Sequence, residues 1–165
     1  MANIIHASGQ FEFNDFWKTL LWYNLRKRWW LVAILTFIEL CGLFVLIAKG
    51  YEPWMIFSLF CPVVIIGAIV FQIYSASNHA LKLTDREIEY SFSITEYEVK
   101  TNSSLVQNEW SNLHQVQETE DSFLLFMHPN VMQPIPKRFF SSEEDITKLR
   151  DILRFALNNK VKLLK

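Results

Sequence analysis

Hydrophobic residues are concentrated in two long segments in the first half of the chain. Residues 29–48 contain one charged side chain, Glu39, and residues 53–74 contain none. Each segment has about 20 residues, and a helix of that length spans a hydrocarbon core about 30 Å thick. Because a helix satisfies its own backbone groups, it is the open element that lipid tolerates. The pattern therefore predicts a transmembrane hairpin of two helices.

After the second apolar segment, the continuous run of hydrophobic residues ends, and every second residue is apolar instead. Alternating apolar and polar residues, separated by turn-forming residues, predict short strands at 81–83, 88–94, 97–99, 113–116, 123–126 and 131–135. From Ile146 to Leu157 the apolar residues recur on one helical stripe, and Ser141 and Glu144 have the spacing of a capping box before it. We therefore expect an α+β membrane protein, with the hairpin followed by a small antiparallel sheet or partial barrel capped by a C-terminal helix.

These patterns divide the chain into three parts: 1–28, 29–74 and 79–165. In the first part, Asn14 is the expected N-cap of a helix over residues 15–28. That helix has a basic end and an apolar face formed by Phe16, Trp17, Leu20, Leu21 and Leu25. Such a face suits either the headgroup plane of a membrane or packing against the soluble part.

The charges flanking the apolar segments predict an orientation. Three consecutive cations occupy positions 26–28 directly before the first segment, and Lys82 and Arg86 follow the second. The short connection at 49–52 has a single cation, Lys49. By the positive-inside rule, both termini are expected in the cytoplasm, with 79–165 as a cytoplasmic domain.

Composition argues against several classes of function. The formal net charge of −1 provides no basic field for nucleic acid. Cys41 and Cys61 both lie in the apolar segments, so they suggest neither a disulfide framework nor a metal site. The histidines are scattered, no nucleophile or paired-carboxylate motif is present, and residues 79–165 contain no glycine for a phosphate-binding loop. We expect no enzyme activity, no cofactor and no metal.

Glu39 is the most informative residue of the apolar segments. A charged carboxylate near the bilayer centre costs about 2.5–3.5 kcal/mol, so Glu39 should be neutral or paired. Pro62 cannot donate to the carbonyl of Ser58, and we hypothesise that protonated Glu39 donates a hydrogen bond to Ser58 instead. The expected interface on the second helix consists of Ser58, Cys61, Pro62, Ile65, Ala68 and Gln72. Alternatively, Glu39 contacts a protein partner or a second copy, or handles protons or ions.

Lys137 and Arg138 are the candidate interaction residues of the C-terminal part. Juxtamembrane cations bind anionic headgroups, each contributing about 1 kcal/mol. However, the nearby acidic run 143–145 would pair with both side chains, which favours internal ion pairs.

The chain resembles the YcxB-like family of bacterial membrane proteins. The matching stretches are 83–89, 109–113, 118–126 and 135–140, and their most specific residues are Trp110, Pro136, Lys137, Arg138 and Phe139. The resemblance implies a bacterial inner-membrane location and a pleckstrin-homology-like cytoplasmic domain, but no activity that could be carried over. Trp110, Pro136 and Phe139 are interpreted as structural, with Trp110 filling the core beneath the C-terminal helix.

These observations together predict a membrane-anchored cytoplasmic protein-binding module without catalytic activity. One alternative is a subunit or immunity-type inhibitor of a membrane assembly or membrane-acting toxin. Another is an anionic-lipid-sensing domain that uses Lys137 and Arg138. The expected partners are the lipid bilayer, a protein and, in some of these interpretations, a second copy in a homo-oligomer.

Overall fold

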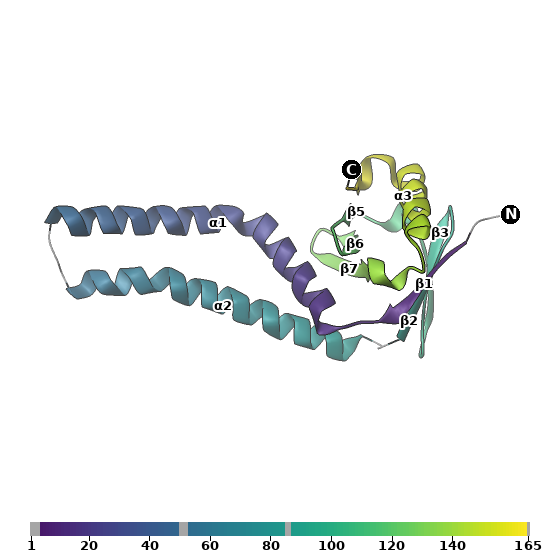
Figure 1. Ribbon diagram of the computed structural model, residues 1–165, viewed down its shortest axis with the longest axis horizontal. Coiled ribbons are helices and arrows are strands. Elements are labelled where there is room, and N and C mark those ends of the chain that lie inside the picture. The colour runs from purple at the N-terminus through teal and green to yellow at the C-terminus, as the bar shows by residue number, and fades with distance from the viewer. Residues whose placement is uncertain (1–3, 50–52, 85–86, 165) are drawn as a thin grey trace. The chain divides into compact units, whose positions relative to one another are not determined.

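The structure of the protein is a computed structural model that describes residues 4–49, 53–84 and 87–164, without the side chains of 45, 46, 49, 53–59 and 61. The predicted connection at 50–52 lies outside the described residues. The fold is α+β, with two mainly antiparallel sheets and a C-terminal helix (Figure 1). Residue contacts divide the chain into one unit of residues 1–16 and 81–165 and a second unit of residues 17–80. The three consecutive parts expected from the sequence stay a prediction.

The first sheet has the order β1-β2-β3-β4, and each neighbouring pair is antiparallel. Its strands are β1 (Ile5–Gln10), β2 (Glu87–Phe92), β3 (Glu96–Thr101) and β4 (Leu105–Glu109). β1 was missed in the sequence, although it precedes both long helices and pairs with the strand that follows them. Its register runs from Ile5 opposite Phe92 to Gln10 opposite Glu87. Residues on both sides of the helical hairpin therefore build the same sheet.

The second sheet has the order β7-β6-β5-β8. It consists of β5 (Gln115–Glu118), β6 (Ser122–His128), β7 (Val131–Pro136) and the short β8 (Val161–Lys162). The strands β5, β6 and β7 are antiparallel, whereas β8 returns from the C-terminal helix and pairs with β5 in parallel. The positions of β6 and β7 agree with the predicted strands, and β8 was not predicted.

The C-terminal helix α3 (Glu143–Leu157) begins one residue later than the predicted capping box implied. Ser142 is the N-cap, and its hydroxyl accepts a hydrogen bond of 3.2 Å from the backbone N–H of Asp145. Ile146, Leu149, Leu153 and Leu157 form the buried stripe of the helix. The chain leaves α3 through Asn158, whose positive φ of 45° turns it towards β8.

Aromatic side chains fill the core of this unit. Phe92 stacks on Phe140, with ring centroids 5.8 Å apart, and Phe140 meets Phe123 of β6 edge to face at 6.0 Å. Tyr90 on β2 is fully buried and accepts a 2.9 Å hydrogen bond from Gln133 on β7. Burial raises the pKa of Tyr90, so its hydroxyl remains protonated and tethers the two sheets.

The second unit consists mainly of α1 (Phe13–Lys49) and α2 (Pro53–Leu83), which form an antiparallel hairpin in Figure 1. The helix α1 begins at Phe13, so Asn14 lies inside it and is not the N-cap. Arg28 has non-helical dihedrals (φ −116°, ψ 15°) and divides α1 at the boundary where the predicted membrane segment starts. The helix α2 continues nine residues past Tyr74, so the strand predicted at 81–83 is wrong. The helix continues through this stretch because 75–83 contains no glycine or proline.

Candidate functional site

Trp110 holds the end of β4 in place. It opens the 3₁₀ turn η1 (Trp110–Asn112), and its indole N–H donates a 2.9 Å hydrogen bond to the carbonyl of Ser93. Its ring lies 4.9 Å from that of Tyr97 on β3 and is almost completely buried. The structure thus places Trp110 in the core, and η1 packs against α3, as expected from the sequence.

The outer edge of β4 presents backbone groups without a strand partner among the described residues. The N–H of Trp110 bonds to Thr95, and the N–H of Thr101 bonds to Ser104. Since bonded residues alternate along antiparallel strands, this register directs Val106 and Asn108 towards β3. The N–H and C=O groups of 105, 107 and 109 consequently point away from the sheet.

The other three sheet edges are shorter, blocked or covered. β8 has only two residues, and β7 contains Pro134 and Pro136, which lack the N–H that a further strand would need. β1 forms a bridge between Ala7 and Phe140 on its outer side. β4 is therefore the edge best able to accept another strand.

The side chains around this edge combine apolar and acidic character. Leu105 and Val106 are exposed to 58% and 47% of their areas. Glu98 on the neighbouring strand accepts a hydrogen bond of 3.1 Å from Gln107. Beyond the end of the strand lies a surface pocket lined by Ile94, Thr95, Glu96, Glu109, Trp110, Ser111 and Ala156. An extended segment with apolar and basic side chains would complement this surface.

Lys137 forms an internal ion pair, although not with the acidic residues expected. It lies in the 3₁₀ turn η2 (Lys137–Phe139), and its Nζ is 2.7 Å from Glu118 on β5. The guanidinium of Arg150 on α3 also binds Glu118, with one nitrogen–oxygen distance of 2.7 Å. The backbone N–H of Leu164 donates to the same carboxylate at 3.1 Å. Glu118 therefore joins β5, η2, α3 and the C-terminal segment.

The carboxylate of Glu118 is completely buried, while the side chains of Lys137 and Arg150 are 17% and 26% exposed. Burial alone would raise the pKa of Glu118. The hydrogen bonds from Arg150, Lys137 and the Leu164 backbone outweigh burial, so the pKa lies below its ordinary value. Glu118 is thus ionised at neutral pH.

Arg138 also pairs internally, with Gln10 before α1 and with Asp15 in the first turn of α1. Its guanidinium lies 2.6 Å from Asp15 and donates a 2.9 Å hydrogen bond to the backbone carbonyl of Gln10. Asp15 in turn accepts a 2.7 Å hydrogen bond from the backbone N–H of Glu12, as in a capping box. Arg138 therefore attaches the start of α1 to η2. The partners expected at 143–145 are wrong for both cations.

Pro136 and Phe139, predicted to be structural, both lie in the core. The ring of Phe139 packs edge to face on Phe11, with centroids 5.2 Å apart, and it also covers Gly9 of β1. A Cβ atom at Gly9 would collide with this ring. The close approach explains why glycine stands at this position of the strand.

In the helical hairpin, Glu39 is half-buried and shares a face of α1 with the half-buried Leu31 and Leu35. On α2, Pro62 is buried, but the expected interface is rotated: Ile65, Ala68 and Gln72 are exposed, whereas Pro62, Ile69 and Ile73 form the inner stripe. The side chains of Ser58 and Cys61 lie outside the described residues. The hydrogen bond between Glu39 and Ser58 consequently stays a prediction.

Among the described residues, Pro62–Leu83 is the one helical segment long and apolar enough to cross a membrane, and only 11% of its apolar 18-residue stretch is buried. This is consistent with membrane association. The crossing of a membrane by both α1 and α2 stays a prediction.

Comparison with protein families gives one match in this region. The family described as YcxB-like protein matches residues 94–153, from the turn before β3 into α3. Residues 94–153 are a YcxB-like domain. The resemblance recognised in the sequence is thus confirmed, and the matched range includes the β4 edge, Trp110, Glu118 and Lys137. Neither the curated proteins nor the solved structures gave a match.

The buried carboxylate of Glu118 in the YcxB-like domain was missed in the sequence. Glu118 looked like one of several surface carboxylates, because its cationic partners lie 19 and 32 residues away in the chain. The alternation of Gln115, Val116, Gln117 and Glu118 places Glu118 on the same strand face as buried Val116, and this was the available signal.

Proposed function

We propose that the chain is a membrane-anchored binding module that accepts an extended segment of a cytoplasmic protein on the outer edge of β4. The observation that carries this proposal is the open edge of a well-anchored strand, where positions 105, 107 and 109 direct their backbone groups outwards. An extended segment added there would form backbone hydrogen bonds as a fifth strand of the first sheet.

The side chains indicate what such a segment contains. Exposed Leu105 and Val106 favour apolar residues, and the carboxylates of Glu96, Glu98 and Glu109 favour lysine or arginine. The backbone bonds would supply affinity, while these side chains would supply specificity. The proposed ligand is therefore an extended protein segment in which apolar and basic residues alternate.

Anchoring in the membrane is supported by the surface of the hairpin. Large apolar side chains are exposed on both helices: Trp29, Phe37, Phe44 and Ile47 on α1 and Phe60, Val63, Val64 and Phe71 on α2 are each at least 60% exposed. Helices that are apolar on all sides require burial in protein or lipid. A bilayer would cover these side chains.

The topology of the first sheet supports two crossings rather than one. β1 ends at Gln10, before the hairpin, and β2 starts at Glu87, after it, and the two residues are paired. A chain whose two ends join one sheet must return to the side of the membrane from which it left. Any crossing is therefore matched by a second. The cations at 26–28 favour the cytoplasmic side for both ends, at a bacterial inner membrane.

The two four-stranded sheets closed by α3 are also compatible with the pleckstrin-homology-like domain that the family resemblance implies. Lipid recognition through Lys137 and Arg138, the alternative raised by the sequence, has less support. Both cations are already held by internal carboxylates, at 2.7 Å and 2.6 Å. Binding a headgroup there would take Lys137 from buried Glu118 and Arg138 from Asp15.

The β4 edge can be tested with a proline substitution matched to alanine. Gln107→Pro removes an N–H that points outwards and leaves the ladder to β3 intact, whereas Gln107→Ala retains that N–H. We expect the full-length protein, purified in mild detergent, to retain a stoichiometric protein partner. Gln107→Pro should lose it, and Gln107→Ala should keep it.

A photo-crosslinker at Leu105 provides the spatial readout, with a crosslinker at Glu89, on the middle of the same sheet, as the control. If the crosslinker at Leu105 forms adducts with the partner and the crosslinker at Glu89 does not, the result supports binding at the β4 edge. If Gln107→Pro retains the partner while Glu39→Gln releases it, the contacts are made by the hairpin, and the interpretation as a subunit or inhibitor of a membrane assembly replaces this proposal.

A further inference from the structure

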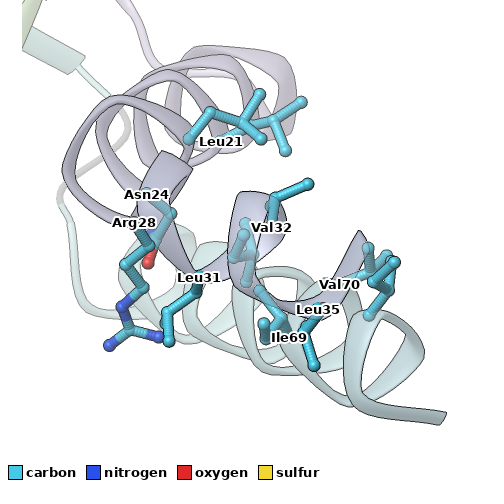
Figure 2. Close-up of a pocket in the computed structure, with 11 residues that line it drawn as sticks. Leu21, Asn24, Arg28, Leu31, Val32, Leu35, Ile69 and Val70 are labelled. Carbon is cyan, nitrogen blue, oxygen red and sulfur yellow. The ribbon is translucent and has the colours of Figure 1, made fainter. Parts of the chain in front are cut away.

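A second candidate site lies in the helical hairpin, between the facing sides of α1 and α2. The groove is lined almost entirely by aliphatic side chains: Leu21, Leu25, Leu31, Val32 and Leu35 of α1 and Ile66, Ile69, Val70 and Ile73 of α2. Asn24 and Arg28 are the two polar residues of its lining (Figure 2). They stand one helical turn apart, at the point where α1 is divided.

Arg28 differs from the two cations beside it. Arg26 lies over the ring of Trp22, at 5.3 Å, and Lys27 lies over the ring of Tyr23, at 5.4 Å. Within the part of the chain that the structure describes, no carboxylate pairs with Arg28. The run 26–28 thus holds two cations against aromatic rings and places the third on the groove.

The position of Arg28 along the helix matches the depth of a lipid headgroup. It directly precedes Trp29 and Trp30, both of which are exposed and aromatic, as is typical of the membrane interface. The groove continues from Arg28 to Leu35 on α1, about 10 Å deeper along the helix axis. Arg28 therefore lies midway along the α1 lining, which runs from Leu21 to Leu35, and the aliphatic side chains on its C-terminal side lie towards the hydrocarbon core.

We propose that this groove binds one anionic phospholipid, with its phosphate on Arg28 and the first part of an acyl chain between α1 and α2. The guanidinium can donate two parallel hydrogen bonds to phosphate oxygens, whereas the Asn24 amide, one turn away on the same lining, already donates a 2.8 Å hydrogen bond to the Leu20 carbonyl. Aliphatic walls with a single cation complement a phospholipid better than they complement an extended protein segment, which would bring unpaired backbone groups into the groove. The inference rests on the membrane anchoring proposed above, but not on the β4 edge.

The test compares phosphatidylglycerol with phosphatidylcholine carrying identical acyl chains. Full-length protein in mild detergent is titrated with each lipid, and native mass spectrometry counts the molecules retained. We expect one retained phosphatidylglycerol and a preference over phosphatidylcholine of about fivefold, equivalent to about 1 kcal/mol for one interfacial cation. Arg28→Gln should abolish the preference.

Arg26→Gln is the matched control, since it removes a neighbouring cation that does not line the groove. It should keep the preference, as should Arg28→Lys, which retains the charge. If Arg26→Gln and Arg28→Gln lose the lipid preference equally, the site is overturned. The preference then comes from diffuse attraction of anionic lipid to the basic run 26–28. No preference in the unchanged protein would also overturn it.

The proposed function fails in a distinguishable way. If the unchanged protein stays in the aqueous phase without detergent, the anchoring is wrong, and the lipid site is overturned with it. If the protein requires detergent and loses its partner in Gln107→Pro but shows no lipid preference, only the lipid site is wrong.

Discussion

Substitution of Glu118 by alanine tests the ionic cluster that joins β5, η2, α3 and the C-terminal segment. The change removes the carboxylate that receives Lys137, Arg150 and the backbone N–H of Leu164. It leaves two cations next to each other in a partly buried site. Removal of one partner from a buried pair costs about 3–5 kcal/mol.

The lower end of this range applies, because Lys137 and Arg150 retain 17% and 26% of their exposure and can turn towards water. We expect a loss of about 3 kcal/mol, a large part of the 5–15 kcal/mol typical of a domain. For a unit of about 100 residues this corresponds to a decrease in Tm of at least about 10 °C.

The assay is thermal unfolding of the full-length protein in detergent, followed by near-UV circular dichroism of the aromatic core. Glu89→Ala is the control: Glu89 also pairs with a lysine, Lys100, at 2.9 Å, but both side chains are about 60% exposed. Exposed pairs are hydrated and screened, so this variant should melt close to the unchanged protein. Equal decreases in Tm for the two variants would refute the reasoning.

The pH dependence provides a second check on Glu118. Its pKa is lower in the folded protein than its ordinary value of 4.5, so the folded state binds the proton less readily than the unfolded chain. The stabilisation is therefore fully present above pH 4.5 and is lost as the pH falls through the lower folded-state pKa. The difference in stability between the unchanged protein and Glu118→Gln should be constant near neutral pH and shrink only below that value.

Three further substitutions test other parts of the structure. Gly9→Ala should destabilise the protein by about 1–3 kcal/mol through the collision with Phe139, whereas Gly67→Ala, where no atom lies within 4 Å, should not, as measured by Tm. Trp110→Phe should cost about 1–3 kcal/mol, because the carbonyl that accepts the indole hydrogen bond is left unsatisfied, and loss of partner binding should accompany it. Glu39→Gln should leave membrane insertion and hairpin packing nearly intact. Loss of partner binding at normal expression would instead give Glu39 a functional role.

The strand and helix periodicities of the C-terminal part were readable because the sheets have one buried face each. Ile88, Tyr90 and Phe92 alternate with polar residues and lie buried on β2 as predicted. Ile94 continues the pattern but is exposed in the turn before β3, where the hydroxyl of Ser93 bonds to Glu96 instead. Alternation alone does not tell where a strand ends.

Two of the errors, the missed strand β1 and the wrong partners of Arg138, share a cause, which is pairing between residues distant in sequence. Residues 5–10 form a strand because β2 lies beside them, although Gln10 and its partner Glu87 are 77 positions apart. Arg138 and Asp15 are 123 positions apart. The nearby acidic run at 143–145 was the reasonable local choice of partners, but its residues cap α3 or pair within it.

The sequence by itself determined the apolar character of both long helices, the order of strands followed by a helix, the YcxB-like resemblance of residues 94–153 and the core position of Trp110. These properties follow from local periodicity and from a motif, which need no knowledge of distant neighbours. Only the tertiary structure decided that the N-terminal residues complete the first sheet, that β4 keeps an open edge, and that Glu118 is a buried anion. Each of these depends on which segments meet after folding, because backbone pairing and burial of charge are set by neighbours in space.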